Sequence, residues 1–208
     1  MTPRARAAPA RIGVFGGTFD PPHFAHLALA EWARIELELD RVWFVPAGVP
    51  PHKRPDSPSA AQHRLAMARL AVRGNPAFGV SPLECRRRGP SYTVDTLRAF
   101  AAAHPRARLH LIMGADMLAT FAHWREPAAI AALATLVVAV RPGTRVAPRR
   151  GLVVLSNPGL EVSSHALRAR ARAGRSIRYL VPDAVARYAE RHRLYAASGR
   201  VSVSRRRA

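Results

Sequence analysis

The sequence predicts an α/β fold of the Rossmann-like, doubly wound kind, with a mainly parallel sheet, helices on both faces and a single domain. Short apolar runs at 12–15, 42–45 and 108–113 alternate with segments of amphipathic helical pattern. The first run ends in a glycine turn that leads directly into a helix. The 208 residues suit one core, so we expect a domain over 11–197 between a disordered leader (1–10) and a basic flexible tail (198–208).

The first unit of this fold is a strand, a turn and a helix between residues 12 and 38. The strand Ile12–Phe15 ends in Gly16-Gly17-Thr18, and a helix pattern starts near Pro22-His23. A second buried strand follows at 41–46. Strand, helix and strand then form a right-handed parallel unit, whose ligands bind beyond the carboxyl ends of the strands.

The turn at Gly16-Gly17 has the chemistry of a phosphate site. Glycine lets a ligand approach the backbone with no Cβ in the way, and the free N–H groups of a helix N-terminus favour an anion. His23 and His26 are three positions apart in the first helical turn, so both rings lie on one face and point towards that anion. The alternative is an ordinary turn with two histidines that only cap the helix.

The middle of the chain continues the alternation. A capping-box pattern at 59–62 opens a helix that reaches about Val72, and a short strand follows near 78–81. Residues 84–90 read as a polar loop, and the next helix starts within 91–97 with Ser91 or Thr93 as its cap.

The strand 108–113 follows and ends in Gly114-Ala115-Asp116. A carboxylate just past a parallel strand is well placed to accept hydrogen bonds from a ribose, although aspartate is also a common helix cap. Further strands are expected at 136–140 and 152–155.

Two more helices complete the expected fold. Ser163 or Ser164 caps a helix to about Ala173, and the final helix follows 179–183 with Pro182 in its first turn. Arg168, one turn into the first of these helices, makes a second anion site there, or else belongs to an ordinary capped, solvated helix.

Lys53 and Trp124 are single residues with two interpretations each. Lys53 is the only lysine among 33 basic residues and falls in the proline-stiffened loop 47–58, which we expect to be an exposed lid. It either contacts phosphate or belongs to a solvated basic loop. Trp124 either stacks on a flat ring beside the crevice or fills the core, and base rates favour the core.

The composition excludes several classes of protein. With 49% hydrophobic residues, no apolar run of membrane-spanning length and no signal peptide, we expect a cytoplasmic protein that does not insert into membranes. The single Cys85 allows no internal disulfide. The formal charge of +20 comes from scattered arginines without a nucleic-acid module, so we expect no specific nucleic-acid binding. The sequence leaves open whether the protein is a monomer or a homo-oligomer.

The opening stretch resembles the signature of the nucleotidyltransferase superfamily, a Gly-Thr-Phe-Asp-Pro turn followed by His-x-Gly-His. Here it reads Gly17-Thr18-Phe19-Asp20-Pro21 and His23-Phe24-Ala25-His26. Ala25 stands where the pattern has glycine, a change that favours helix and that we expect to cost no chemistry.

Strings along nearly the whole chain resemble one member family, the bacterial nicotinate-nucleotide adenylyltransferases. The matching strings are 16–27, 50–53, 91–97, 113–116 with Trp124, 163–168 and 179–183. The resemblance implies transfer of the adenylyl group of ATP to nicotinate mononucleotide, with Mg²⁺ held by the ATP phosphates and no metal-binding residue. It implies catalytic roles for His23, His26, Lys53 and Arg168.

The resemblance also implies two sets of binding residues. For ATP they are Gly16, Gly17, Thr18, Phe19, His23, His26, Gly114, Asp116, Ser163, Ser164 and Arg168. For nicotinate mononucleotide they are Thr18, Lys53, Thr93, Asp116 and Trp124. His165 replaces a threonine of the family pattern, so a hydroxyl contact there is in doubt, whereas Leu167 for isoleucine changes only shape.

The sequence leaves three alternative functions to consider. Pantetheine-phosphate adenylyltransferases share the opening signature but lack the middle and late strings. Nicotinamide mononucleotide differs from the nicotinate form by one charge, and the sequence does not show which residues recognise this difference. A nucleic-acid-binding module is the alternative of another class, and a salt titration would separate it.

Overall fold

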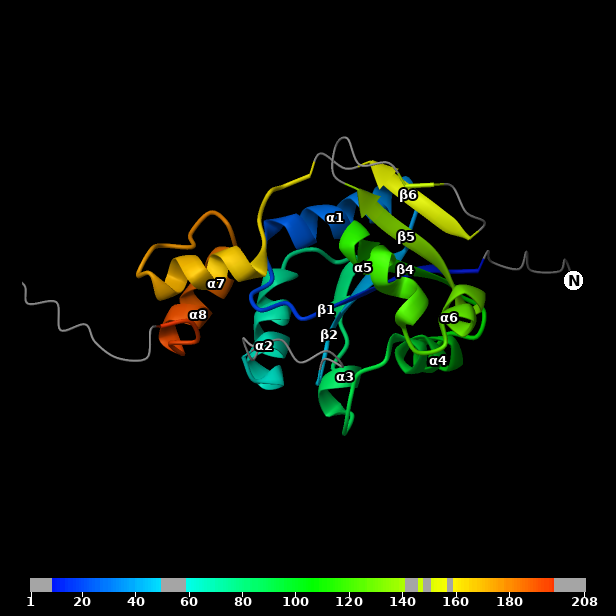
Figure 1. Ribbon diagram of the computed structural model, residues 1–208, viewed down its shortest axis with the longest axis horizontal. Coiled ribbons are helices and arrows are strands. Elements are labelled where there is room, and N and C mark those ends of the chain that lie inside the picture. Colours follow the sequence, from blue (N-terminus) through cyan, green and yellow to red (C-terminus); the bar gives the residue numbers. More distant parts are fainter. Residues whose placement is uncertain (1–8, 50–58, 141–145, 148–150, 157–158, 197–208) are drawn as a thin grey trace, which may run out of the picture.

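The protein is described by a computed structural model that covers residues 9–49, 59–140, 146–147, 151–156 and 159–196 (Figure 1). One six-stranded sheet forms its centre, in the order β3-β2-β1-β4-β5-β6. The strands are β1 (Arg11–Gly17), β2 (Arg41–Pro46), β3 (Phe78–Val80), β4 (Arg108–Gly114), β5 (Ala134–Val140) and β6 (Leu152–Ser156). All neighbouring strands are parallel, which confirms the predicted fold class. The strand order reverses between β1 and β4, where ligands of such sheets bind.

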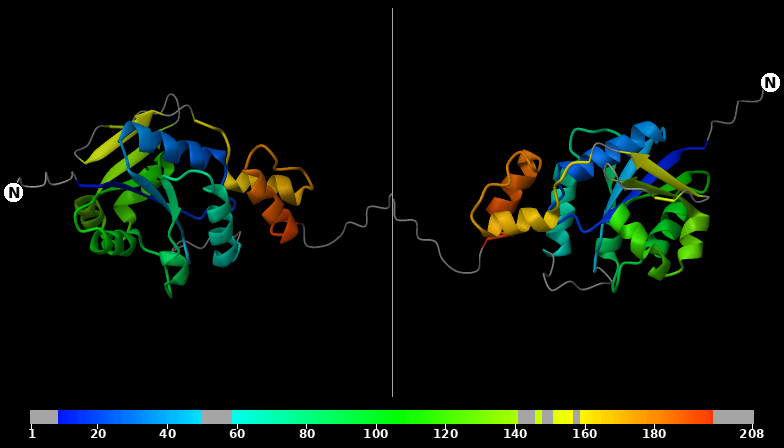
Figure 2. Two further views of the ribbon diagram at one scale, coloured as in Figure 1. Left: turned by 180° about the vertical axis from the view of Figure 1, so that it is seen from behind. Right: turned by 45° about the horizontal axis from the view of Figure 1, so that its top comes forward.

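Helices cover both faces of the sheet. They are α1 (Phe24–Glu36), α2 (Ala61–Ala71), α3 (Leu83–Arg86), α4 (Thr93–Ala103), α5 (Ala115–Thr120), the 3₁₀ turn η1 (Phe121–His123), α6 (Pro127–Leu133), α7 (Ser164–Arg172) and α8 (Asp183–Arg191). The cluster on one face includes α1, and the cluster on the other face includes α4 and α6. Helices α7 and α8 form a lobe with α2 at one end of the molecule, around a third apolar cluster (Figure 2).

Strand β1 shows how the sheet divides the core. Ile12 and Val14 face the α4 and α6 side, whereas Phe15 faces α1. This alternation is the period of two that a strand imposes. Each large apolar side chain buried in this way contributes about 1.5–3 kcal/mol to stability, so the central strands hold the loops at their carboxyl ends in fixed positions.

Two of the expected helix caps are wrong. Helix α2 begins after Ala60, and the backbone N–H of Ser59 instead donates to Asp20 Oδ2 at 2.9 Å. Helix α4 begins after Tyr92, and Ser91 Oγ accepts from the backbone N–H of Gly48 at 2.9 Å. In both places the polar groups bind another loop, which stabilises the carboxyl edge of the sheet in place of the helix end.

Other elements also differ from the expectation. The predicted loop 84–90 starts inside α3, and Glu84 is buried with Thr96 Oγ1 donating to its carboxylate at 2.6 Å. The sequence analysis did not predict α5, η1 or α6 between 115 and 133. Pro182 precedes α8 as its cap and is not part of its first turn. The predicted Ser163 cap of α7 is confirmed, since its Oγ accepts from the N–H of Ala166 at 3.2 Å.

Most of the predicted leader and all of the predicted tail lie outside the described residues. The carbonyl of Ala10 already accepts from the N–H of Arg108 at 2.7 Å. Within the described segments, every helix is too short or too polar to cross a bilayer.

Candidate active site

The site is built where the loops after β1 and β2 meet. Gly16 and Gly17 end β1, and the turn Thr18–Pro22 carries the chain into α1. The N–H of Ala47, just past β2, donates to the carbonyl of Gly17 at 2.9 Å. The two loops are therefore joined directly at the carboxyl edge of the sheet, as the strand–helix–strand pattern predicts.

His23 and His26 lie together at the N-terminus of α1. Their rings stack with centroids 3.7 Å apart and planes at 30°. His26 Nδ1 accepts from the backbone N–H of His23 at 3.2 Å, so the neutral ring of His26 carries its proton on Nε2. His23 Nδ1 is buried and has no hydrogen-bond partner among the described residues. A buried polar atom of this kind is expected to bind a ligand or water.

Burial keeps both imidazoles neutral at pH 7. It lowers the pKa of His23 from its usual 6.5 to about 4. Burial also lowers the pKa of His26 well below 6.5, and the charge that His23 would carry lowers it further. Both rings therefore meet an incoming anion as neutral hydrogen-bond donors, and an anion with two or more negative charges would raise both pKa values.

Phe19 packs against His26 from the core side. Its side chain is buried among Phe15, Phe44 and the edge of His26, whose ring centroid lies 5.0 Å away. Its backbone φ of 51° is left-handed, which is uncommon for a residue other than glycine. Any contact of Phe19 with a nucleotide is consequently limited to its backbone, because the ring faces the core.

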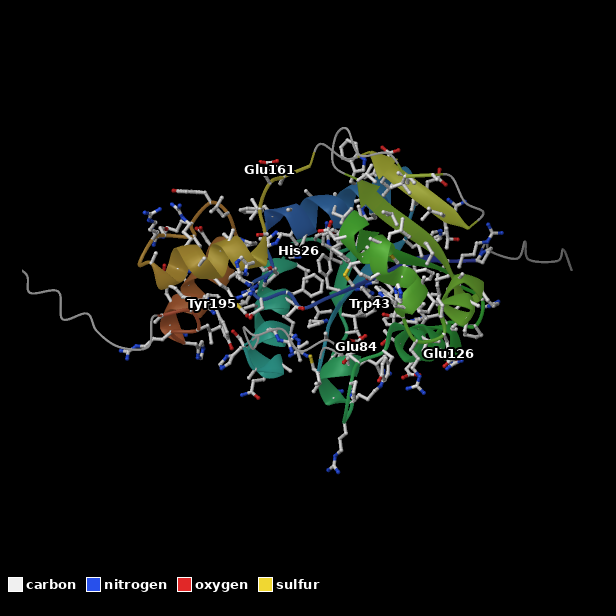
Figure 3. The ribbon with its side chains drawn as sticks, in the orientation of Figure 1. His26, Trp43, Glu84, Glu126, Glu161 and Tyr195 are labelled. Carbon is white, nitrogen blue, oxygen red and sulfur yellow. The ribbon has the colours of Figure 1, made fainter. Side chains whose placement is uncertain are left out.

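Asp20 is the polar centre of the turn and is fully buried. Its Oδ1 accepts from the hydroxyl of Tyr195 at 2.7 Å, and its Oδ2 accepts from the N–H of Ser59 at 2.9 Å. Figure 3 labels Tyr195 beside α7 and α8. Burial, followed by the charge of Asp20, raises the pKa of Tyr195, so its hydroxyl remains a donor. The signature turn is thus tied to a residue beyond the last helix.

Helix α7 also contacts this turn. Ser164 Oγ donates to the carbonyl of Pro21 at 2.9 Å, and Arg168 Nη1 donates to the carbonyl of Asp20 at 2.9 Å. Arg168 Nε is buried without a hydrogen-bond partner among the described residues. Ser163, the cap of α7, is exposed. The structure therefore brings Arg168 and Ser164 to the turn that precedes His23.

The remaining predicted residues follow β4 or lie farther along the chain. Gly114 caps α5, and Asp116 is exposed in its first turn. Thr93 is half-buried as the first residue of α4. Trp124 is half-buried against the core cluster, and its Nε1 donates to Thr120 Oγ1 at 3.3 Å. Lys53 lies outside the described residues.

The structure also identifies Arg64, Tyr195 and Glu84, which the sequence analysis missed. All three are buried polar residues near the loops of the site. Arg64 could have been recognised from the sequence, because it occupies the same buried face of α2 as Met67, Ala68 and Ala71. An arginine on an otherwise apolar helix face needs a specific partner. No local pattern points to Tyr195, which pairs with Asp20 from 175 positions away.

The described residues provide no cluster of three or more histidine, cysteine, aspartate or glutamate side chains suited to a metal ion. At the turn, the carboxylate of Asp20 already has partners, whereas His23 Nδ1 and Arg168 Nε have no hydrogen-bond partner among the described residues. Such groups suit phosphate oxygens.

Comparison with known proteins places the chain among nucleotide-transferring enzymes. Residues 14–170 match the cytidylyltransferase-like family. A probable nicotinate-nucleotide adenylyltransferase of Salinibacter ruber is 48% identical over 189 residues, covering 88% of this chain and 97% of the relative. The protein of the same name from Geobacillus kaustophilus is 42% identical over 187 residues, covering 90% and 87% of the two chains.

A solved structure has the same fold. It is the nicotinic acid mononucleotide adenylyltransferase of Plasmodium falciparum in complex with NaAD, with a TM-score of 0.75. The match covers 89% of this chain and 97% of that one at 18% sequence identity, and a second structure of that enzyme holds APC. At this identity the likeness concerns the fold alone.

Proposed function

Because the chain belongs to the cytidylyltransferase-like family and, within it, to the nicotinate-nucleotide adenylyltransferases, we propose that the turn after β1 and the start of α7 carry out adenylyl transfer. The reaction transfers the adenylyl group of ATP to nicotinate mononucleotide and yields nicotinic acid adenine dinucleotide and pyrophosphate. The observation that carries the assignment of residues is the stacked pair of neutral histidines beyond the carboxyl end of β1, in which the buried His23 Nδ1 has no hydrogen-bond partner among the described residues.

The chemistry requires alignment and charge stabilisation and no covalent intermediate. An oxygen of the mononucleotide phosphate attacks the α-phosphorus of ATP, a new P–O bond forms, and the bond to the bridging oxygen breaks. Pyrophosphate leaves with that electron pair, so the atoms and charges balance without a proton transfer. The protein needs to hold the two nucleotides in line and to stabilise the negative charge that spreads over the phosphates.

The triphosphate is assigned to the groups around the signature turn. The side chains of His23 and His26 donate hydrogen bonds to phosphate oxygens, and Arg168 adds a positive charge from α7. Gly16 and Gly17 let the nucleotide approach the backbone. Lys53, the fourth proposed catalytic residue, would add a point charge from the loop after β2, outside the described residues.

The rest of the two substrates is assigned to residues near the switch point. We assign the ribose contact to Asp116, which is exposed just past the end of β4. We assign the nicotinate ring to Trp124 and Thr93, both of which are half-buried and therefore partly open to a ligand. We assign Thr18 to contacts with both substrates.

A divalent metal ion is part of the proposed reaction, and we take it to be Mg²⁺. Because the described residues offer no metal-binding cluster, we propose that the ion arrives on the ATP phosphates as part of the substrate. It neutralises phosphate charge when bound. We propose that the reaction takes place in the cytoplasm. We also propose that residues 11–197 form a single nucleotidyltransferase domain.

The direct test is an acceptor series. The protein is incubated with ATP, Mg²⁺ and one acceptor at a time, namely nicotinate mononucleotide, nicotinamide mononucleotide or phosphopantetheine, and pyrophosphate release is measured. We expect the highest kcat/KM with nicotinate mononucleotide. Highest activity with phosphopantetheine, or none with any acceptor, would overturn the assignment. A salt titration with DNA and RNA tests the nucleic-acid alternative, since specific binding would persist at moderate salt.

A further inference from the structure

Arg64 connects three separate segments at the carboxyl edge of the sheet. It lies in the first turn of α2 and is 1% exposed. Nε donates to the carbonyl of Ser59 at 2.8 Å, Nη1 to that of Thr18 at 3.1 Å and Nη2 to that of Gly48 at 2.8 Å. Each nitrogen of the guanidinium therefore binds a carbonyl of a different stretch of chain.

The three carbonyls belong to the loops that form the site. Thr18 precedes the histidines, Gly48 follows β2, and Ser59 precedes α2. Ser59 is held on both sides, because its N–H donates to Asp20 Oδ2 while its carbonyl accepts from Arg64. Gly48 is likewise held on both sides, by Arg64 and by Ser91 Oγ. Arg64 therefore adds a side-chain link between the β1 and β2 loops to the backbone hydrogen bond that joins Ala47 N–H to the Gly17 carbonyl.

The guanidinium of Arg64 is buried without an ion-pair partner. Among the described residues, no carboxylate lies within ion-pair distance of Arg64, and its three hydrogen bonds go to carbonyls. Moving a cation into the protein interior costs several kcal/mol. An apolar side chain of similar length would fill the same space without that cost, but it could not donate hydrogen bonds to the three carbonyls. The donors of the planar guanidinium are therefore the property that this position requires.

We propose that Arg64 is a positioning residue for adenylyl transfer, one that fixes the turn of His23 and His26 relative to the loop after β2. The inference rests on the proposed function. Lysine cannot replace it, because an ammonium group donates from one point and cannot reach three carbonyls spread around a planar fork. Loss of the fork leaves the turn free to shift, and a small misplacement of an aligning group is costly in catalysis.

The test compares Arg64→Met, Arg64→Lys and Arg64→Gly with Ile130→Ala. Ile130 is buried on α6, in the core cluster that includes α4, so its truncation lowers the melting temperature while the Arg64 hydrogen bonds remain. Steady-state kinetics for both substrates are measured well below each melting temperature. We expect kcat/KM for ATP to fall at least tenfold in each Arg64 variant, through both kcat and KM, and to stay within twofold in Ile130→Ala.

Chemical rescue and hydrogen exchange separate positioning from stability. Methylguanidinium should restore Arg64→Gly at least fivefold without affecting Arg64→Met, whose side chain fills the space. Amide exchange in Arg64→Lys should accelerate in peptides over 13–24 and remain unchanged over 127–140. The exchange result is independent of activity, so it tests Arg64 even if the wild-type protein releases no pyrophosphate and the proposed function fails.

Three outcomes would overturn the proposal. One is kcat/KM within twofold of wild type in folded Arg64→Met or Arg64→Lys. Another is a loss of activity that Ile130→Ala reproduces at an equal change in melting temperature. The last is failure of all three Arg64 variants to fold, which would assign the residue to the fold alone.

Discussion

The imidazole rings of His23 and His26 lie face to face, 3.7 Å apart, at the first turn of α1. Two stacked cations at this distance would repel each other strongly in a buried environment. The arrangement is therefore stable with neutral rings, in agreement with the lowered pKa of both side chains. In the proposed function, a triphosphate bound there would supply the negative charge that changes this balance.

We expect His26→Ala to lower kcat at least about a hundredfold, the scale of losing one donor to a charged transition state. The fold should survive, because the ring's hydrogen bond stays within the first turn of α1 and His26 belongs to none of the three apolar core clusters. Pyrophosphate release under saturating substrates measures the effect. His104→Ala, at the C-terminal end of α4, is the matched control and should retain full activity. Near-normal turnover in His26→Ala would remove its catalytic role.

Stability should fall below pH 6.5 because of His23. The unfolded chain has the usual His pKa of 6.5, whereas the folded pKa is about 4, so between these values the unfolded state binds more protons. The free energy of unfolding therefore decreases as the pH falls through this window, by up to about 3 kcal/mol from this residue. Urea unfolding at pH 7 and pH 5 measures the change, and His23→Gln should show a smaller one. Equal pH dependence in both proteins would contradict the lowered pKa.

The elements around β1 could be predicted from sequence because their signals are local. The apolar run, the glycine pair and the helical period of α1 all lie within 27 residues, 12–38. The helices between 115 and 133 could not be predicted in the same way. Helix α5 has six residues and η1 has three, too few for a periodic pattern, so packing decides their form.

The support of the site was harder to foresee than its ligand-facing residues. The pairing of Tyr195 with Asp20 joins residues 175 positions apart, and no local sequence pattern near either residue predicts it. The sequence pattern predicts Ser59 and Ser91 as helix caps, whereas the N–H of Ser59 and the hydroxyl of Ser91 bind neighbouring loops. Local hydrogen-bonding propensity indicates that such groups need partners but does not indicate which partners they take.

Trp124→Ala should affect one substrate more than the other. If the half-buried indole stacks on the nicotinate ring, its loss should raise KM for nicotinate mononucleotide about tenfold, equivalent to about 1.4 kcal/mol, and leave KM for ATP within about twofold. Trp32→Ala, an exposed tryptophan of α1, is the control and should change neither value. Equal increases in both KM values would count against stacking.

Tyr195→Phe should destabilise the protein by about 1.5–3 kcal/mol, the range for hydrogen bonds to charged groups. The substitution removes the donor from Asp20 Oδ1 and leaves a fully buried carboxylate with one partner fewer. Urea unfolding at pH 7 measures the loss. Tyr179→Phe is the control, because Tyr179 is 86% exposed and its change should stay within about 0.5 kcal/mol. Equal stability of the two variants would show that the bond to Asp20 contributes little.

Gly16→Ala adds one methyl group that should affect nucleotide binding but not folding. Apart from its chain neighbours, a Cβ at Gly16 meets no atom of the described residues within 4 Å, so the substituted protein should fold with a free energy of unfolding within about 0.5 kcal/mol of wild type. If ATP approaches the backbone there, the added methyl group lies in its path, and KM for ATP should rise at least about tenfold.

Gly17→Ala is the informative comparison. A Cβ at Gly17 would lie 3.0 Å from Cζ of Phe19, whose ring packs against His26, so this substitution should disturb the fold as well as the site. Thermal unfolding and ATP saturation curves for both variants give the two quantities independently. If Gly16→Ala kept both its stability and its KM for ATP, the nucleotide would have to bind away from this strand end, because the open space beside Gly16 would then be unused.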